Sequence, residues 1–229
     1  MARPALSDAD RDLRRRHLLD TARRLYRERG ALPLVADIAA SAGLAKGTVY
    51  LYFKTKEEIF VALLEDYFDG LYAAMDSLLP ALPVAGAAAA RQFAAAYCAL
   101  LRHDSGLLPL AVMGNTVLEK NLPLQAMLQF KTRLAQGLTR AGALLDARVA
   151  PPGEQRGAAL LLQTYGLTIG LWQALDYPAA LSDIIAQHGA LAILKRDFYQ
   201  ELEQAVERLW RAALLESAAP PGKVADDPA

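Results

Sequence analysis

The order of apolar and polar residues predicts helices along almost the whole chain of 229 residues. Apolar side chains recur three and four positions apart, which is the spacing of one helix face. No run of alternating β-branched residues is long enough to form a strand. The pattern therefore predicts an all-α fold of about nine to ten helices.

The first predicted helix covers residues 7–28. Ser7 and Asp10 stand at the spacing of a capping box, with aspartate in place of the usual glutamate. Gly30 follows the last apolar position, where glycine ends helices in the left-handed conformation. The residues expected to face the core are Leu13, Leu18, Ala22 and Leu25.

Two short helices and one long helix are predicted next. The short helices cover 35–42 and 46–52, and the segment AGLA separates them. Thr55 and Glu58 form a capping box that opens the long helix, and Pro80 closes it. Three helices before a long one, with a short turn between the second and the third, are the layout of a helix-turn-helix DNA-binding domain.

The rest of the chain is predicted to form further helices, which prolines and glycines separate. These helices are expected at 86–103, 107–118, 123–147, 154–176, 180–188 and 192–215. The tail 217–229 is polar and rich in proline and small residues, which predicts disorder. We expect a helix-turn-helix domain in 1–56 and a larger helical domain in 57–216.

Residues 157–175 carry no charge and are nearly long enough to span a bilayer. Gln163, Thr164 and Gln173 interrupt the apolar run, and the other predicted helices are amphipathic. We therefore expect a helix buried inside protein, and no membrane as a partner.

Charge is unevenly distributed, although Lys and Arg together number 25 and so do Asp and Glu. Residues 1–56 hold 12 basic and 6 acidic residues, a net charge of +6. Residues 57–229 hold 13 basic and 19 acidic residues, a net charge of −6. A basic segment attached to an acidic body indicates that the first part of the chain meets a polyanion.

Cysteine and histidine usage argues against disulfides, metal sites and catalysis. Cys98 is the single cysteine, so no intramolecular disulfide forms. His17, His103 and His188 offer no zinc-ligand spacing, and Cys98 and His103 point about 140° apart on one helix. We expect no catalytic residue, no metal and no cofactor. Because the N-terminus lacks an apolar secretory segment, we expect a cytoplasmic protein.

The segment GLAKGTVYLYFKTKEE at 43–58 is the most distinctive stretch of the chain. Gly43 suits the left-handed conformation that ends a helix, and Leu44 suits packing under the turn. The next helix then points outward, with Lys46, Gly47 and Thr48 at its start, where it would enter a DNA major groove. Glycine inside a helix costs about 1 kcal/mol relative to alanine, so Gly47 indicates a close approach of the backbone to a ligand.

The longer segment DIAASAGLAKGTVYLYFKTKEEIF closely resembles the DNA-binding signature of the tetracycline-repressor (TetR) family of bacterial regulators. The resemblance covers about residues 12–68. Phenol hydroxyls and an ammonium group near a helix N-terminus are suitable donors to phosphate oxygens. The DNA-facing residues that the resemblance implies are Lys46, Gly47 and Thr48 for bases or nearby phosphates, and Tyr50, Tyr52 and Lys56 for the DNA backbone.

Two departures from the family pattern modify this expectation. Pro33, Leu34 and Ala36 stand where the family usually has threonines and a polar or basic residue, so we expect fewer phosphate contacts there. Ala45 precedes Lys46 where the family usually has Ser or Thr, so a side-chain N-cap of about 1 kcal/mol should be absent.

The resemblance also implies that residues 57–216 bind a small ligand and dimerise. The dimer would form through the helices near 154–176 and 192–215. Aromatic and methionine side chains at helical spacing are candidates for an apolar pocket, and a plain core explains any one of them equally well. The candidates are Phe93, Tyr97, Met113, Met127, Phe130, Tyr165 and Trp172.

The function expected from this resemblance is a homodimeric repressor that binds double-stranded operator DNA. A small, largely apolar effector would release it by binding only the dimer state in which the recognition helices are separated. The alternative left open is a helical interaction or membrane-associated protein without a DNA role, since 157–175 and the C-terminal helices are strongly apolar.

Overall fold

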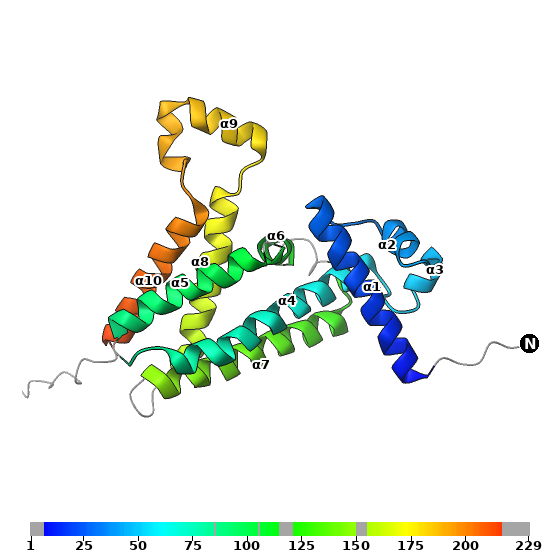
Figure 1. Ribbon diagram of the computed structural model, residues 1–229, viewed down its shortest axis with the longest axis horizontal. Coiled ribbons are helices and arrows are strands. Elements are labelled where there is room, and N and C mark those ends of the chain that lie inside the picture. Colours follow the sequence, from blue (N-terminus) through cyan, green and yellow to red (C-terminus); the bar gives the residue numbers. More distant parts are fainter. Residues whose placement is uncertain (1–6, 85, 105, 115–120, 150–154, 217–229) are drawn as a thin grey trace, which may run out of the picture. The chain divides into compact units, whose positions relative to one another are not determined.

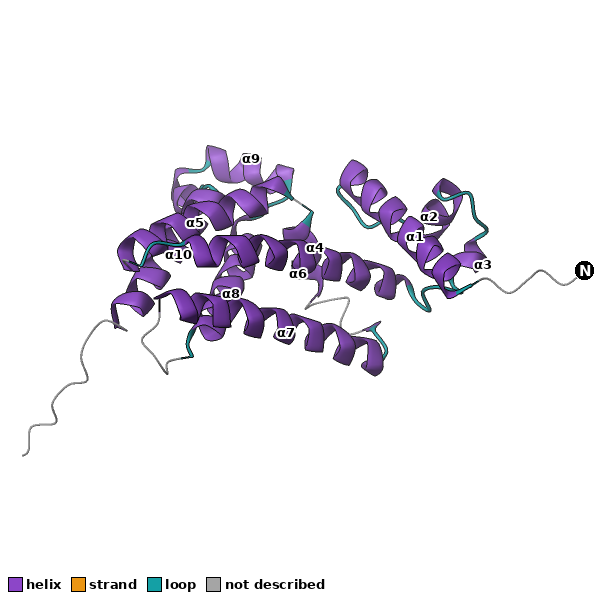
Figure 2. Cartoon of the chain, turned by 60° about the horizontal axis from the view of Figure 1, so that its bottom comes forward, coloured by secondary structure: helices purple, strands orange, loops and turns teal. Residues whose placement is uncertain are grey.

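The computed structural model describes residues 7–84, 86–104, 106–114, 121–149 and 155–216 (Figure 1). These residues form α-helices and short 3-10 helices joined by loops, and no strand occurs within the described ranges (Figure 2). The all-α prediction is confirmed. The expected disordered tail at 217–229 lies outside the described residues.

Contacts divide the chain into two compact units. The first groups Met1–Gly70 with Asp104–Leu134, and the second groups Leu71–His103 with Ala135–Ala229. Two long helices, α4 (Lys56–Leu78) and α7 (Leu124–Val149), contribute residues to both units. The domain boundary expected at residue 56 is drawn between a DNA-binding part and a ligand-binding part. The contact units do not test this division by function, so the boundary stays a prediction.

Helix α1 (Asp8–Arg29) begins and ends where its capping residues predict. Ser7 Oγ accepts a hydrogen bond from the Asp10 amide at 3.2 Å, and Gly30 takes a left-handed φ of 63°. The other three predicted core residues are buried, but Leu13 is 60% exposed. The prediction for Leu13 is wrong because no other element of the described residues covers the first turns of the helix, which stay almost entirely exposed.

Two short helices follow, α2 (Val35–Ser41) and α3 (Lys46–Val49). Helix α3 is shorter than predicted because the backbone turns directly after its last residue. Thr55 Oγ1 accepts from the Glu58 amide at 3.2 Å, and Glu58 Oε2 accepts from the Lys54 amide at 2.7 Å. These capping bonds open α4 at the predicted place.

In the first unit, α4 is bonded to the start of α7. Arg133 donates to Glu65 at 3.0 Å and to Asp69 at 3.1 Å, and the rings of Phe68 and Phe130 lie 6.4 Å apart. The two helices run alongside each other here, as Figures 1 and 2 both show. Helix α6 (Leu107–Met113) also belongs to this unit, and its predicted continuation over 115–118 lies outside the described residues.

The second unit has an aromatic residue at its centre. Trp210 is fully buried, stacks on Phe93 with ring centroids 3.5 Å apart, and donates from Nε1 to Thr164 Oγ1 at 2.9 Å. The uncharged segment that contains Thr164 is therefore a packed helix, as predicted. Nowhere in the described part of the chain is a helix both long and apolar enough to cross a bilayer. Besides the ends of α4 and α7, the helices around this core are η1 (Leu79–Ala81), α5 (Gly86–His103), α8 (Gly157–Leu175) and α10 (Phe198–Glu216).

Helices α7 and α8 meet at a close backbone contact. A Cβ built on Gly142 of α7 would lie 2.4 Å from the Ala158 nitrogen of α8, so only glycine fits there. Asp146, one turn further along α7, accepts the Gly157 amide at 2.7 Å and thereby caps α8. Residues of one helix therefore fix where the other begins.

Two further helices lie between α8 and α10 in the chain, α9 (Ala179–Gln187) and the 3-10 helix η4 (Gly189–Leu194), and they pack against each other. The sequence predicts one helix over 192–215, whereas α10 begins only at Phe198. The prediction of one continuous helix is wrong because Asp197 Oδ1 accepts the Gln200 amide at 2.8 Å and caps α10 there, while 192–194 belong to η4.

Candidate nucleic-acid interface

The turn between α2 and α3 is built on Gly43. This residue takes a φ of 67°, in the left-handed region that residues with a Cβ rarely adopt. The amides of Gly43 and Leu44 donate to the carbonyls of Ala40 and Ala39 at 3.1 and 2.9 Å. The conformation predicted for Gly43 is confirmed, and these bonds hold the start of α3 against the end of α2.

Helix α3 leaves most of its surface open. Val49 is fully buried and anchors the helix, whereas Lys46 and Gly47 are exposed and Thr48 is half-buried. A Cβ built on Gly47 would meet nothing within 4 Å, so the protein's own packing does not require glycine there. Ala45 makes no side-chain cap, as expected. The structure therefore brings the three predicted base-facing residues together on one open turn.

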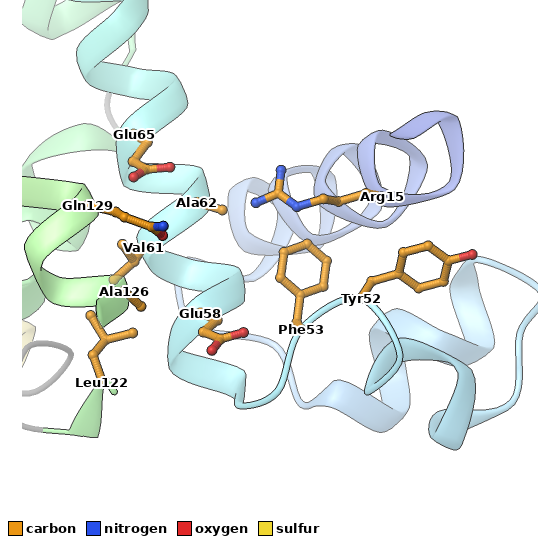
Figure 3. Close-up of a pocket in the computed structure, with 10 residues that line it drawn as sticks. All are labelled: Arg15, Tyr52, Phe53, Glu58, Val61, Ala62, Glu65, Leu122, Ala126 and Gln129. Carbon is orange, nitrogen blue, oxygen red and sulfur yellow. The ribbon is translucent and has the colours of Figure 1, made fainter. Parts of the chain in front are cut away.

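The segment that leaves α3 presents the other three predicted DNA contacts. Tyr50 is 43% exposed, Tyr52 is half-buried and Lys56 is exposed, with its ammonium 3.8 Å from a Glu57 carboxylate oxygen. Figure 3 shows the Tyr52 hydroxyl pointing away from α4. Phe53 is only 2% exposed and is a core aromatic. The polar side chains of this segment are thus accessible, while the buried Phe53 ring holds the segment in place.

Residues 33–36 offer no polar side chain to a partner, as the sequence indicates. Leu34 is 70% exposed, Ala36 is exposed and Pro33 is buried. Leu34 is the N-cap of α2 and makes no side-chain capping bond. A DNA contact at this place would rest on the amides of the first turn of α2.

Acidic partners neutralise the arginines in the second half of α1. Exposed ion pairs of this kind add only about 0–1 kcal/mol to stability each, so their main effect is on local charge. The pairs are Arg23 with Asp66, Arg24 with Glu28, Arg27 with Asp104, and Arg29 with Asp37.

The first half of α1 keeps its arginines unpaired. Arg11, Arg14 and Arg16 are exposed, and none makes an ion pair with a residue in the described ranges, although three aspartates in the same turns lower the net charge. The sequence shows the positive charge of 1–56 but not which arginines stay unpaired, because ion pairing depends on the fold. They are additional candidates for phosphate contacts.

The second half of α1 is bonded to the segment that leads into α6. The Tyr26 hydroxyl donates to the Gly106 carbonyl at 3.3 Å, and Arg27 bonds both carboxylate oxygens of Asp104 at 3.1 and 3.2 Å. Burial, and then the neighbouring Tyr67, raise the pKa of Tyr26 to about 12, so its phenol stays protonated and able to donate. A Cβ on Gly106 would lie 2.5 Å from the Tyr67 hydroxyl, so this close approach requires glycine.

The seven predicted effector contacts fall in both contact units. In the second unit, Phe93 and Tyr97 are buried, their rings stack 5.5 Å apart, and the Tyr97 hydroxyl shares a 3.1 Å hydrogen bond with Thr168. Tyr165 and Trp172 of α8 are half-buried.

In the first unit, Phe130 is buried, and Met113 and Met127 are half-buried. None of the seven is among the residues that line the pocket of Figure 3. Their role as effector contacts stays a prediction.

Cys98 is a buried thiol, 1% exposed. Burial, and then the nearby Glu203 carboxylate, raise its pKa to about 12. A thiol needs its deprotonated form to react, so Cys98 serves as a small apolar side chain.

Comparison with known families decides the class of protein. Residues 63–215 match the family model described as "Tetracyclin repressor-like, C-terminal domain", and residues 18–63 match "Bacterial regulatory proteins, tetR family". The chain belongs to the tetracycline-repressor family. The resemblance of its first part to TetR regulators is confirmed, and the family match extends through α10.

Relatives of this TetR-family chain include the HTH-type transcriptional repressor KstR2 of Mycolicibacterium smegmatis. The two are 37% identical over 67 residues, which are 29% of this chain and 33% of the repressor. The match spans about a third of the length of the curated KstR2 repressors that resemble the chain.

Two solved structures share the TetR fold with this chain. FadR from Bacillus subtilis in complex with stearoyl-CoA has a TM-score of 0.50 and 18% identity, covering 85% of this chain and 97% of that one. RolR in complex with resorcinol has a TM-score of 0.53 and 22% identity, covering 94% and 97%. At these identities the likeness establishes the fold.

Proposed function

We propose that the chain is a sequence-specific DNA-binding transcription regulator, namely a dimeric repressor that a small, largely apolar effector releases from its operator. Helix α3 carries the proposal, because one buried residue, Val49, anchors a turn whose other residues are open to a partner. Membership of the TetR family and the likeness to a named repressor support it.

Each proposed DNA contact has a chemical role. Lys46 and Thr48 offer an ammonium and a hydroxyl to bases and nearby phosphates, and Gly47 lets the α3 backbone come close to the DNA. The phenols of Tyr50 and Tyr52 and the ammonium of Lys56 donate to phosphate oxygens, which positions the protein without specifying sequence.

The proposed dimer forms through α8 and α10. Leu162 of α8 is 52% exposed, and Cβ atoms built on Gly166 and Gly170 would meet nothing within 4 Å. Small residues allow two helices to pack at short interaxial distance. Two subunits related by a twofold axis would place their recognition helices about 34 Å apart, or farther on a longer operator.

The proposed effector acts by shifting the dimer between two states. The FadR and RolR structures hold stearoyl-CoA and resorcinol, which supports a small organic effector for this chain as well. The effector lowers operator affinity by as much as it prefers the state with separated recognition helices.

The remaining expectations follow from this role. A regulator works where the DNA is, so we place the protein in the cytoplasm and assign it no catalytic residue. The interaction or membrane alternative loses its main support, because α8, the helix that suggested it, packs on α10 through Thr164 and Trp210.

A binding measurement tests the proposal. The full chain is titrated into a labelled duplex from the promoter next to its own gene and into a shuffled duplex at the same salt, with fluorescence anisotropy as the readout. We expect specific binding to be tighter by about 10³-fold or more. Equal affinity for both duplexes would remove the basis for a sequence-specific regulator.

A further inference from the structure

A pocket of about 180 Å³ lies in the first unit, where the chain leaves α3 (Figure 3). Its walls come from α1, the segment after α3, the first turns of α4, and the start of α7. The polar side chains on opposite walls are Arg15, Glu58, Glu65 and Gln129, and Val61 and Ala62 supply an apolar surface between them.

Arg15 stands in one wall of the pocket without a counter-charge bound to it. Its guanidinium carbon lies 5.0 Å from the centroid of the Phe53 ring, and the side chain is half-buried. It makes no hydrogen bond and no ion pair with any residue of the described ranges, unlike Arg23 and Arg27 on the same helix. This cation–π contact leaves the guanidinium N–H groups without an acceptor among the described residues, so they are available to an anionic group.

Two carboxylates face the pocket from α4. One oxygen of Glu58 accepts the Lys54 amide at 2.7 Å, and one oxygen of Glu65 accepts from Arg133 at 3.0 Å. Each glutamate keeps its second oxygen for another donor. Burial raises the pKa of Glu65 although Arg133 and Arg15 are near enough to lower it, so a further cation beside this carboxylate would favour its charged form. A cationic group would be stabilised at this wall.

We propose that this pocket binds a small zwitterion of the α-amino-acid class. The ligand carboxylate bonds to Arg15, its ammonium bonds to Glu65, and a short aliphatic side chain lies on Val61 and Ala62, all residues that Figure 3 labels. A simple anion would meet the two glutamates and a simple amine would meet the arginine, whereas a ligand with both charges satisfies both walls. The pocket is smaller than the roughly 300 Å³ at which drug-sized sites begin, which sets an upper limit on the ligand.

Such a ligand would tie α1 to α4 beside the recognition helix. Tyr52, a proposed phosphate contact, also lines the pocket. A bound ligand would therefore hold the segment after α3 in place. The binding site itself does not depend on a DNA role. Its regulatory effect, a change of operator affinity, rests on the proposed function.

Isothermal titration of the full, DNA-free chain tests the site. L-alanine, L-valine and L-leucine are the probes, followed by two analogues of the best binder, one without the ammonium and one without the carboxylate. We expect saturable binding of at least one amino acid and at least tenfold weaker binding of both analogues. Absence of saturable heat for all three amino acids overturns the proposal, as does an analogue that binds equally well.

Matched variants locate the binding. Arg15→Gln keeps a polar side chain beside Phe53 but removes the charge, and we expect it to weaken amino-acid binding at least tenfold. Arg102→Gln makes the same change at an exposed arginine that also lies over an aromatic ring, Tyr199, but does not line the pocket, so it should leave the amino-acid affinity unchanged. Circular dichroism confirms that both variants are folded. If Arg15→Gln binds like the unmodified protein, the ligand occupies another place and the proposal fails.

Operator titrations with and without the amino acid separate the two proposals. Amino-acid binding by a chain that ignores its promoter DNA would support the pocket and overturn the regulator. Promoter binding by a chain that gives no heat with any of the amino acids would support the regulator and overturn the pocket.

Discussion

Single residues of α3 and its continuation divide into those that hold the fold and those that are free to bind. Val49 and Phe53 are almost completely buried, so substituting them would remove core contacts. Lys46 and Gly47 are exposed, and the protein itself makes no use of the glycine at 47. Effects on folding and on DNA binding should therefore separate cleanly at this helix.

Gly47→Ala should move stability and DNA affinity in opposite directions. Alanine meets no atom of the protein at this position, and it favours the helix by about 0.5–1 kcal/mol. The added methyl group would, however, stand between the α3 backbone and the DNA. We expect a higher urea midpoint and weaker operator binding by anisotropy. Gly70→Ala, in open space on α4, is the control that should raise stability without affecting DNA; unchanged operator affinity for Gly47→Ala would refute a close approach there.

The thiol of Cys98 should be unreactive in the folded protein. With its pKa raised to about 12, only a minute fraction is thiolate at pH 8, and the side chain is 1% exposed. Ellman's reagent should release one equivalent promptly from protein unfolded in guanidinium and react orders of magnitude more slowly with native protein. Rapid reaction of the native protein would mean that α5 opens far more often than its packing suggests.

At the level of helices, stability depends on a few places where one helix fixes another. The backbone of α7 touches that of α8 at Gly142, and Asp146 of α7 caps the start of α8. Helix α1 is tied to the segment before α6 through Arg27 and Tyr26. These contacts join parts of the chain that are distant in sequence, and each depends on a single residue.

Gly142→Ala should destabilise the protein by about 1–3 kcal/mol or more, the usual range for overpacking. The new Cβ would stand 2.4 Å from the Ala158 backbone nitrogen, which no rotamer change can relieve. Equilibrium urea unfolding measures the loss. Gly70→Ala again provides the contrast, since the same chemical change in open space should stabilise; equal effects of the two would show that the helices separate easily.

The helices were predictable wherever a local signal specifies them. Ser7, Thr55 and Gly43 form the caps and the turn that their sequence context predicts, because capping bonds span only three or four residues. The amphipathic pattern did not predict that Leu13 lies beyond the elements that cover α1. Nor did it identify Asp197 as the residue that delays the start of α10.

The candidate site was predictable in part for the same reason. Lys46 to Lys56 are adjacent in the chain, so one motif brings the proposed DNA contacts together. The pocket at Arg15 is lined by residues from four separate segments, so no pattern along the chain predicts it. The pairing of Arg27 with Asp104 is likewise a property of the fold.

For the whole molecule, the proposal is that two subunits bind one operator, which doubles the effect of every DNA contact. Affinity then depends on salt according to the number of phosphates that both copies neutralise. Two measurements address this, one on the DNA complex and one on the free protein.

Lys56→Gln should reduce the salt dependence of operator binding by the effect of two phosphate contacts, one from each subunit. Each lost phosphate contact lowers the magnitude of the slope of log K against log salt by about 0.9, so a dimer should lose about 1.8. Anisotropy titrations at several salt concentrations give the slope. A change of half that size would indicate that one subunit contacts the DNA, and an unchanged slope would remove Lys56 from the interface.

Gly166→Leu should leave the subunit folded and prevent its dimerisation. A side chain at this position meets nothing within the subunit, but it would hold the partner's α8 away. Analytical ultracentrifugation should show monomers, with an unaltered helical signal in circular dichroism. Gly70→Leu makes the same change outside the proposed interface and should remain dimeric; a dimeric Gly166→Leu would place the interface elsewhere.

Because Cys98 is the chain's single thiol and is buried, the natural sequence offers no accessible thiol to a thiol-reactive label. Leu51→Cys, at a position 75% exposed beside α3, would then carry the single accessible label of each subunit. Pulsed electron resonance could follow the separation of the two recognition helices, about 34 Å for successive major-groove contacts, while candidate effectors are added. Because Cys98 does not react, the distance between the two labels can be measured without first replacing a natural cysteine.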